Sequence, residues 1–99
     1  MTQIQPVSPS APMETAFLSV DPQGLDLQKA QDLARLKARE LNPDAMLLAW
    51  YDARSGIGYP DVECGSRDEP PWQVFARARG GNLTIDINDG AYTFIYLKL

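Results

Sequence analysis

Apolar and polar residues alternate along the last third of the chain, residues 72–97. Apolar side chains recur there at every second position, which is the spacing of a strand with one buried face. Two dipeptides, Gly80-Gly81 and Asp89-Gly90, interrupt the alternation, and each can supply the positive φ of a two-residue hairpin turn. The pattern therefore predicts three antiparallel strands joined by two tight turns.

Each predicted turn fixes the register in which its two flanking strands pair. The two registers can therefore be compared, because both must place the apolar residues on the same face. Gly80-Gly81 would place Ala76 opposite Ile85, and Asp89-Gly90 would place Ile85 opposite Phe94. A slip of one residue at either turn would move the apolar set to the wrong face. Both registers predict one apolar face, made of Trp72, Val74, Ala76, Ala78, Leu83, Ile85, Ile87, Tyr92, Phe94 and Tyr96. The other, outer face is mixed and carries Gln73, Phe75, Arg77, Arg79, Asn82, Thr84, Asp86, Thr93, Ile95 and Leu97.

A helix is predicted earlier in the chain, from a cap at Asp26 to about Leu41. Asp26 is a favourable N-cap, and Asn42-Pro43 ends the helical pattern because proline cannot continue it. Residues at helical spacing form an apolar stripe whose alanines allow close packing on a sheet. The stripe consists of Leu27, Ala30, Ala34, Ala38 and Leu41. The opposite, solvated face carries Gln28, Gln31, Asp32, Arg35 and Arg39.

Three shorter apolar segments predict the remaining strands. Residues 15–20 form a first strand, residues 45–51 an interior strand covered on both faces, and residues 57–59 an edge strand before Pro60. The predicted fold class is therefore α+β: one helix packed on one face of a single, mostly antiparallel sheet, in the order β-α-β-(β)-β-β-β. Residues 1–14, rich in proline and without apolar periodicity, are predicted to be a flexible tail before a single domain over residues 15–99.

Composition excludes several classes of function. The chain has 99 residues and a net charge of −4, which disfavours nucleic acids and anionic membranes as partners. It contains no apolar run of about 18 residues that could span a bilayer. It has no histidine, which removes the Ser-His and Cys-His nucleophile pairs and imidazole metal ligands. No cofactor and no metal are predicted.

The segment between residues 61 and 71 holds the remaining candidate chemistry. Cys64 is the only cysteine, and a lone thiol without a secretory signal predicts a reducing, cytoplasmic location. It is either a small apolar residue that fixes the loop or a thiol activated by Arg67. The nearby carboxylates do not have the spacing of a calcium loop and are interpreted as a solvated acidic cluster. They are Asp61, Glu63, Asp68 and Glu69.

The outer face of the predicted sheet is the favoured binding surface. Two guanidinium groups, Arg77 and Arg79, would lie beside the Thr84 hydroxyl and could hold a carboxylate or a phosphate. Cross-strand pairing with Asp86 could instead occupy them. The candidate ligand-binding or partner-binding residues are Phe75, Arg77, Arg79, Thr84, Asp86 and Ile95.

Several segments between residues 47 and 96 carry a resemblance to known sequences. They are Leu48-Ala49-Trp50-Tyr51-Asp52, Glu63-Cys64, Asp68 with Pro71-Trp72, Ala78-Arg79-Gly80-Gly81-Asn82, and the series Tyr92, Phe94, Tyr96. Together they resemble a small prokaryotic family of uncharacterised α+β domains, a domain of unknown function. The resemblance implies a compact single domain without an assigned activity, and it supplies no functional residues.

Three functions remain open. The first is a binding module whose outer sheet face receives a ligand or a protein, with small-anion binding as an alternative. The second is a self-associating protein that uses the same face or the flank of Leu33 and Leu36. The third is an enzyme that uses Cys64 or the loop carboxylates, and the missing histidine makes it the least favoured. We therefore expect a non-enzymatic module whose partner is itself or another protein, and neither nucleic acid nor membrane.

Overall fold

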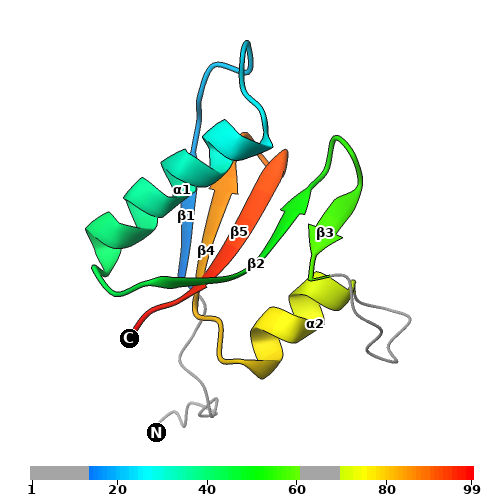
Figure 1. The fold of residues 1–99 in the computed structure, drawn as a ribbon. Coiled ribbons are helices and arrows are strands. Elements are labelled where there is room, and N and C mark those ends of the chain that lie inside the picture. The colour runs from blue at the N-terminus through cyan, green and yellow to red at the C-terminus, as the bar shows by residue number, and fades with distance from the viewer. Residues whose placement is uncertain (1–13, 61–69) are drawn as a thin grey trace, which may run out of the picture.

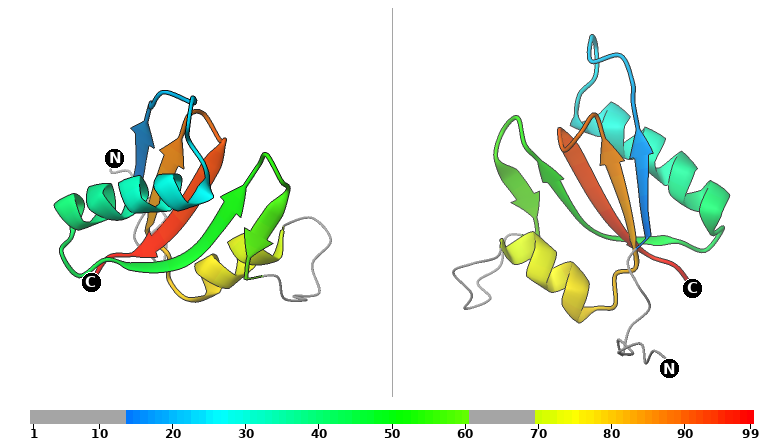
Figure 2. Two further views of the ribbon diagram at one scale, coloured as in Figure 1. Left: turned by 45° about the horizontal axis from the view of Figure 1, so that its top comes forward. Right: turned by 180° about the vertical axis from the view of Figure 1, so that it is seen from behind.

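A five-stranded sheet forms the middle layer of the domain, and one helix lies on each of its faces (Figure 1, Figure 2). The computed structural model describes residues 14–60 and 70–99. The elements, in chain order, are β1 (Glu14–Leu18), α1 (Leu27–Leu41), β2 (Met46–Asp52), β3 (Ile57–Tyr59), α2 (Pro71–Ala78), β4 (Leu83–Ile87) and β5 (Tyr92–Leu97). The strand order is β1-β4-β5-β2-β3, with β1 parallel to β4 and the other neighbours antiparallel. The predicted α+β class with a single, mostly antiparallel sheet is confirmed.

The hairpin of β4 and β5 has the predicted register. Ile85 pairs with Phe94, and Ile87 pairs with Tyr92. Asp89 and Gly90 have φ of 58° and 92°, as two-residue turns with positive φ at both central positions require. The Asp86 carboxylate accepts a hydrogen bond of 2.6 Å from the Gly90 backbone N–H, which fixes the turn from inside the hairpin.

The predicted helix is also confirmed, with its cap. The Asp26 carboxylate accepts a hydrogen bond of 2.8 Å from the backbone N–H of Lys29, and Asn42 caps the other end. The alanine stripe is fully buried against the inner face of the sheet, which is the face toward α1. This inner core consists of Leu25, Ala30, Ala34, Ala38, Ala45, Leu83, Ile85, Ile87, Tyr92, Phe94 and Tyr96.

The segment predicted as the first strand of the meander is instead the helix α2, so this prediction was wrong. Pro71 occupies a first-turn position, where its missing N–H costs nothing, and the backbone N–H groups of Gln73 and Val74 both bond to the Pro70 carbonyl. At the other end, Gly80 has φ of 83°, and its N–H bonds to the Arg77 carbonyl, while Gly81 bonds to that of Ala76. Gly80-Gly81 is therefore a Schellman helix terminus and not a hairpin turn.

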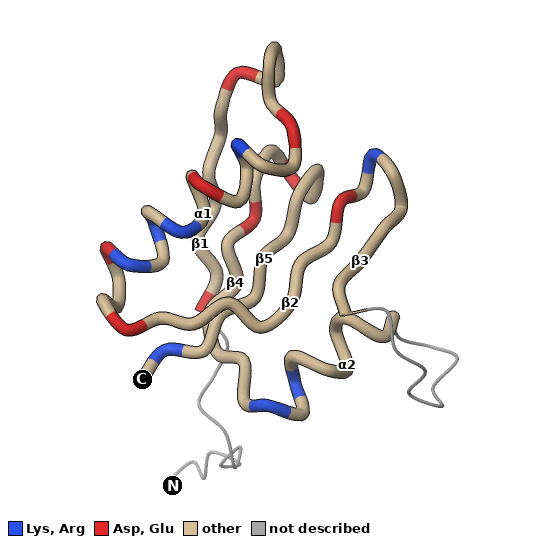
Figure 3. Tube along the Cα trace, in the orientation of Figure 1, with Lys and Arg blue, Asp and Glu red and all other residues tan. Residues whose placement is uncertain are grey.

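The second helix changes the arrangement of the sheet in two ways. The place beside β4 that the sequence pattern gave to residues 72–79 is taken by β1, in parallel register. The outer face, opposite α1, is no longer bare, because α2 packs over β2 and β3. The end of α2 carries the basic residues Arg77 and Arg79 (Figure 3). The prediction of a single helix was thus wrong, and the observed order is β-α-β-β-α-β-β.

The other predicted strands are found at or near their expected places. Residues 15–20 correspond to β1, residues 45–51 to β2 in the sheet interior, and residues 57–59 to β3 at an edge. Residues 1–13 of the predicted tail lie outside the described residues. The last residue of that predicted tail, Glu14, is the first residue of β1. Cys64 and the four loop carboxylates lie outside the described residues.

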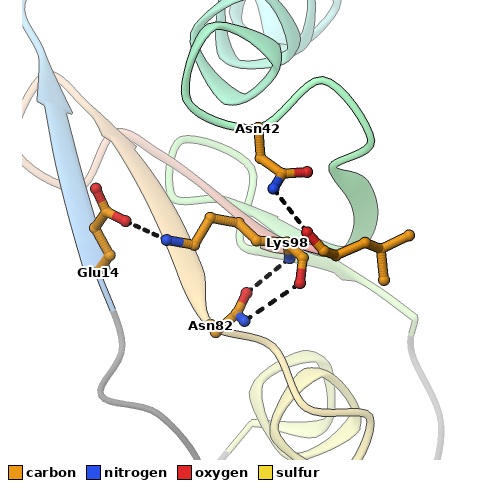
Figure 4. Close-up of polar contacts among 5 residues, drawn as sticks. Glu14, Asn42, Asn82 and Lys98 are labelled. Atoms are coloured by element: carbon orange, nitrogen blue, oxygen red, sulfur yellow. Dashed lines mark hydrogen bonds and ion pairs between the residues drawn. The ribbon is translucent and has the colours of Figure 1, made fainter.

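The C-terminal residues connect three parts of the domain (Figure 4). The Asn82 side chain, between α2 and β4, accepts a 2.7 Å hydrogen bond from the Lys98 backbone N–H and donates one to its carbonyl. The Lys98 ammonium group contacts the Glu14 carboxylate at the start of β1. The Asn42 side chain, at the end of α1, donates a hydrogen bond of 2.9 Å to the Leu99 carbonyl.

Candidate functional site

The outer face of the sheet is only partly covered, and a hollow of about 360 Å³ lies where α2 meets the open part. Ala76 of α2 packs on Ala49 of β2 and Ile95 of β5. The short side chains of the two alanines allow the helix to lie close to the sheet. The helix contacts β2 and β3, so the outer side of β4 stays open beside it. The outer-face hollow is lined by Trp72, Gln73, Arg77, Thr84, Thr93 and Ile95.

Trp72 is the largest side chain of this hollow, and its position is tightly fixed. Its ring stacks on Tyr51 of β2, with 5.2 Å between ring centroids and 11° between planes. Gly58 of β3 makes this possible, because a Cβ at that position would lie 2.3 Å from Trp72 Cδ1. The indole N–H is buried and has no hydrogen-bond partner among residues 14–60 and 70–99. The indole is therefore a rigid wall of the hollow.

The six predicted binding residues do not form one cluster. Arg77, Thr84 and Ile95 line the outer-face hollow. Phe75 and Arg79 line a different hollow of about 460 Å³, next to Met46, Leu48 and Leu97, where the Arg79 guanidinium stacks over the Phe75 ring at 3.7 Å. Asp86 is held by the turn at Gly90.

The predicted pairing of Arg77 and Arg79 around one anion therefore has no support in the geometry. The two residues were predicted to share a strand face, but they lie on a helix, where positions two apart point in different directions. Each guanidinium belongs to a different hollow.

One exposed aromatic residue on this face, Phe17, was not among the binding residues predicted from the sequence. Phe17 of β1 is 70% exposed, and it pairs in register with Asp86, which in turn pairs with Thr93. The strand spacing puts Phe17 about 10 Å from Thr93, which lines the outer-face hollow. The sequence shows Phe17 in a short apolar segment, but only the parallel pairing of β1 with β4 places it on the outer face.

Two further classes of site, a metal centre and a membrane-spanning helix, have no support in the described part of the chain. Residues 14–60 and 70–99 contain no group of three or more Cys, Asp and Glu side chains that could hold a metal ion. Neither of the helices in this part is long and apolar enough to cross a membrane.

Comparison with known proteins places the chain among uncharacterised relatives. Residues 13–96 match the family described as a domain of unknown function (DUF5619). An uncharacterized protein from Archaeoglobus fulgidus is 34% identical over 70 residues, which are 71% of this chain and 74% of that protein. A crystal structure of a protein from the same archaeon, described as novel, is similar with a TM-score of 0.73 and 28% identity, and the match covers 88% of this chain and 95% of that one.

Proposed function

The chain belongs to the family of domains of unknown function DUF5619, and we propose that it is a non-enzymatic module that associates with a second copy of itself through the outer face of its sheet. The family confirms the resemblance expected from residues 47–96, and the match extends to residues 13–96. Its description gives no activity, so the proposal is supported by the surface of the domain alone.

The observation that carries this proposal is that one surface presents both a protruding aromatic side chain, Phe17, and the outer-face hollow. Phe17 is 70% exposed at the edge of the outer face, and the outer-face hollow lies across β4 from it. In a two-fold contact the same patch is used by both copies, so residue i meets residue j and residue j meets residue i. Phe17 of each copy would then enter the hollow of the other, between Trp72 and Thr84.

The polar residues around this contact favour one defined orientation of the two copies over nonspecific hydrophobic association. Interfaces combine an aromatic core with a polar rim. The hydroxyl groups of Thr84 and Thr93 line the hollow, and Asp86 lies between the hollow and Phe17. Arg77 lines the same hollow, so the patch carries charges of both signs and can be complementary to itself.

Sedimentation equilibrium of the full chain at several concentrations tests the proposal. We expect a reversible monomer–dimer equilibrium for the wild type and a monomer for Phe17→Glu, because the variant loses the aromatic ring that fills the hollow and brings a carboxylate against Trp72 and Ile95. Leu36→Glu is the matched control: Leu36 is 69% exposed but lies on α1, on the other side of the sheet. Its dimerisation should equal that of the wild type.

Two results would overturn self-association through this face. One is a wild-type protein that stays monomeric at high micromolar concentration. The other is equal weakening by Phe17→Glu and Leu36→Glu, which would mean that the exposed apolar residues adhere without a defined contact.

The proposal includes a cytoplasmic location. Its support is the sequence argument that a chain with one cysteine has no internal disulfide to gain from an oxidising compartment.

A further inference from the structure

Another hollow, of about 280 Å³, lies on the opposite side of the sheet, between α1 and the strands β2 and β5. Gln31, Arg35 and Arg39 follow one another at a spacing of four residues, so they lie on one side of α1 and form one wall. Ala45, Met46 and Leu47 form the apolar wall, and Tyr96 of β5 completes the lining. We call this site the arginine hollow.

Tyr96 contributes a phenol hydroxyl to the arginine hollow. The residue is 3% exposed. Its hydroxyl makes no hydrogen bond to another described residue, yet it is not one of their buried unpaired atoms, so it is open to the hollow. Burial raises the pKa of Tyr96 to about 12, and the charges of Arg35 and Arg39 act in the opposite direction, so both guanidinium groups lie close enough to influence the phenol. The hydroxyl is therefore free to donate a hydrogen bond to a ligand that occupies the hollow.

The charges of the two arginines are only weakly compensated within the described residues. Arg35 lies 3.4 Å from the Asp32 carboxylate, but both side chains are about half exposed, so that pair is weak. Arg39 has no hydrogen bond or ion pair to another described residue. Lys37, on a different side of the same helix, is by contrast paired with Glu40 at 2.8 Å. The basic residues along α1 are visible in Figure 3.

We propose that the arginine hollow binds a small phosphate monoester. Guanidinium groups match phosphate oxygens with forked pairs of N–H donors, and two of them balance the double negative charge that a phosphate monoester carries near neutral pH. The Tyr96 hydroxyl donates to a third oxygen, and the Gln31 amide lies on the same wall. Met46 and Leu47 provide an apolar surface for the organic group. A carboxylate, with a single charge, would leave one arginine unpaired.

Titration of the isotope-labelled full chain, followed by backbone amide NMR shifts at constant ionic strength, tests this site with three probes. Phenyl phosphate should give saturable shifts that centre on Ala45, Leu47 and Tyr96. Inorganic phosphate should bind several-fold more weakly, because it cannot use the apolar wall, and benzoate more weakly still. Shifts that never saturate, or a preference for benzoate, would overturn the assignment.

Three variants separate a built site from general attraction of anions. Arg39→Gln should weaken phenyl phosphate by about tenfold or more, since it removes a charge-assisted contact. Tyr96→Phe removes only the hydroxyl and should weaken binding by about threefold to tenfold. Lys37→Gln is the matched control, with the same loss of charge on the same helix, and it should bind like the wild type. Equal weakening by Arg39→Gln and Lys37→Gln would refute the site.

This proposal does not depend on self-association. The Phe17→Glu variant, on the opposite face, should bind phenyl phosphate with the affinity of the wild type. Loss of binding in that variant would contradict a site contained within one copy of the chain.

Discussion

Replacement of Ile85 by alanine should remove much of the stability of this domain. Ile85 is fully buried at the centre of the sheet, paired with Ala16 of β1 on one side and Phe94 of β5 on the other. It belongs to the same core cluster as the fully buried alanines Ala30 and Ala34 of α1, which are too short to fill the space of the three carbon atoms that the substitution removes. The cost should therefore lie in the upper half of the usual range of about 2–5 kcal/mol.

Urea unfolding measures this loss directly. A decrease of about 4 kcal/mol, with a slope of about 2 kcal/mol per molar urea, would move the unfolding midpoint by about 2 M. A domain of this size has only about 5–15 kcal/mol in total, so the variant should be close to the limit of folding at higher temperature. Ile57→Ala is the control, because Ile57 is 58% exposed on the edge strand β3 and should cost less than about 1 kcal/mol. Equal midpoints for Ile85→Ala and the wild type would show that the sheet is packed with its faces reversed.

Two further outcomes follow from particular contacts. Gly58→Ala should lower the free energy of unfolding by about 1–3 kcal/mol, because its Cβ would lie 2.3 Å from Trp72 Cδ1, and tryptophan fluorescence should report the displaced indole; an unchanged spectrum and midpoint would refute this contact. Burial raises the pKa of Tyr96 to about 12 in the folded state, so the unfolded chain, with a value of about 10, ionises first as the pH rises. Between these values the wild type should therefore lose stability relative to Tyr96→Phe, and well below pH 10 the difference between the two should not vary with pH.

The elements that the sequence predicted correctly are those with local, mutually consistent signals. The helix α1 has a capping aspartate, a stripe of small residues at helical spacing and a proline after its end, all within about 18 residues. The hairpin of β4 and β5 has a turn dipeptide flanked by alternating apolar residues. In both cases the signal that starts or ends the element agrees with its periodicity, and the structure contains both as expected.

The segment 72–79 was misinterpreted because its apolar residues satisfy two periods. Trp72, Val74, Ala76 and Ala78 alternate as in a strand, whereas Trp72 and Ala76 also have the i, i+4 spacing of a helix. Pro71, which suits the first turn of a helix, and Gly80, which suits its end, distinguish the two periods. The Gly80-Gly81 dipeptide suits a hairpin turn as well as a helix end. Its agreement with the register predicted from Asp89-Gly90 was therefore no independent evidence that residues 72–79 form a strand.

The candidate sites depend on contacts between distant parts of the chain, and this is why the sequence could not predict them. Phe17 reaches the outer face only through the parallel pairing of β1 with β4, whose residues are almost 70 positions apart in the sequence. The i, i+4 spacing of Arg35 and Arg39 is visible in the sequence, where it indicates a solvated helix face. Its meaning changes once Tyr96 is found in the same hollow, because the phenol adds a hydrogen-bond donor beside the two charges. An arginine pair on a predicted helix therefore becomes informative only together with the strand on which the helix packs.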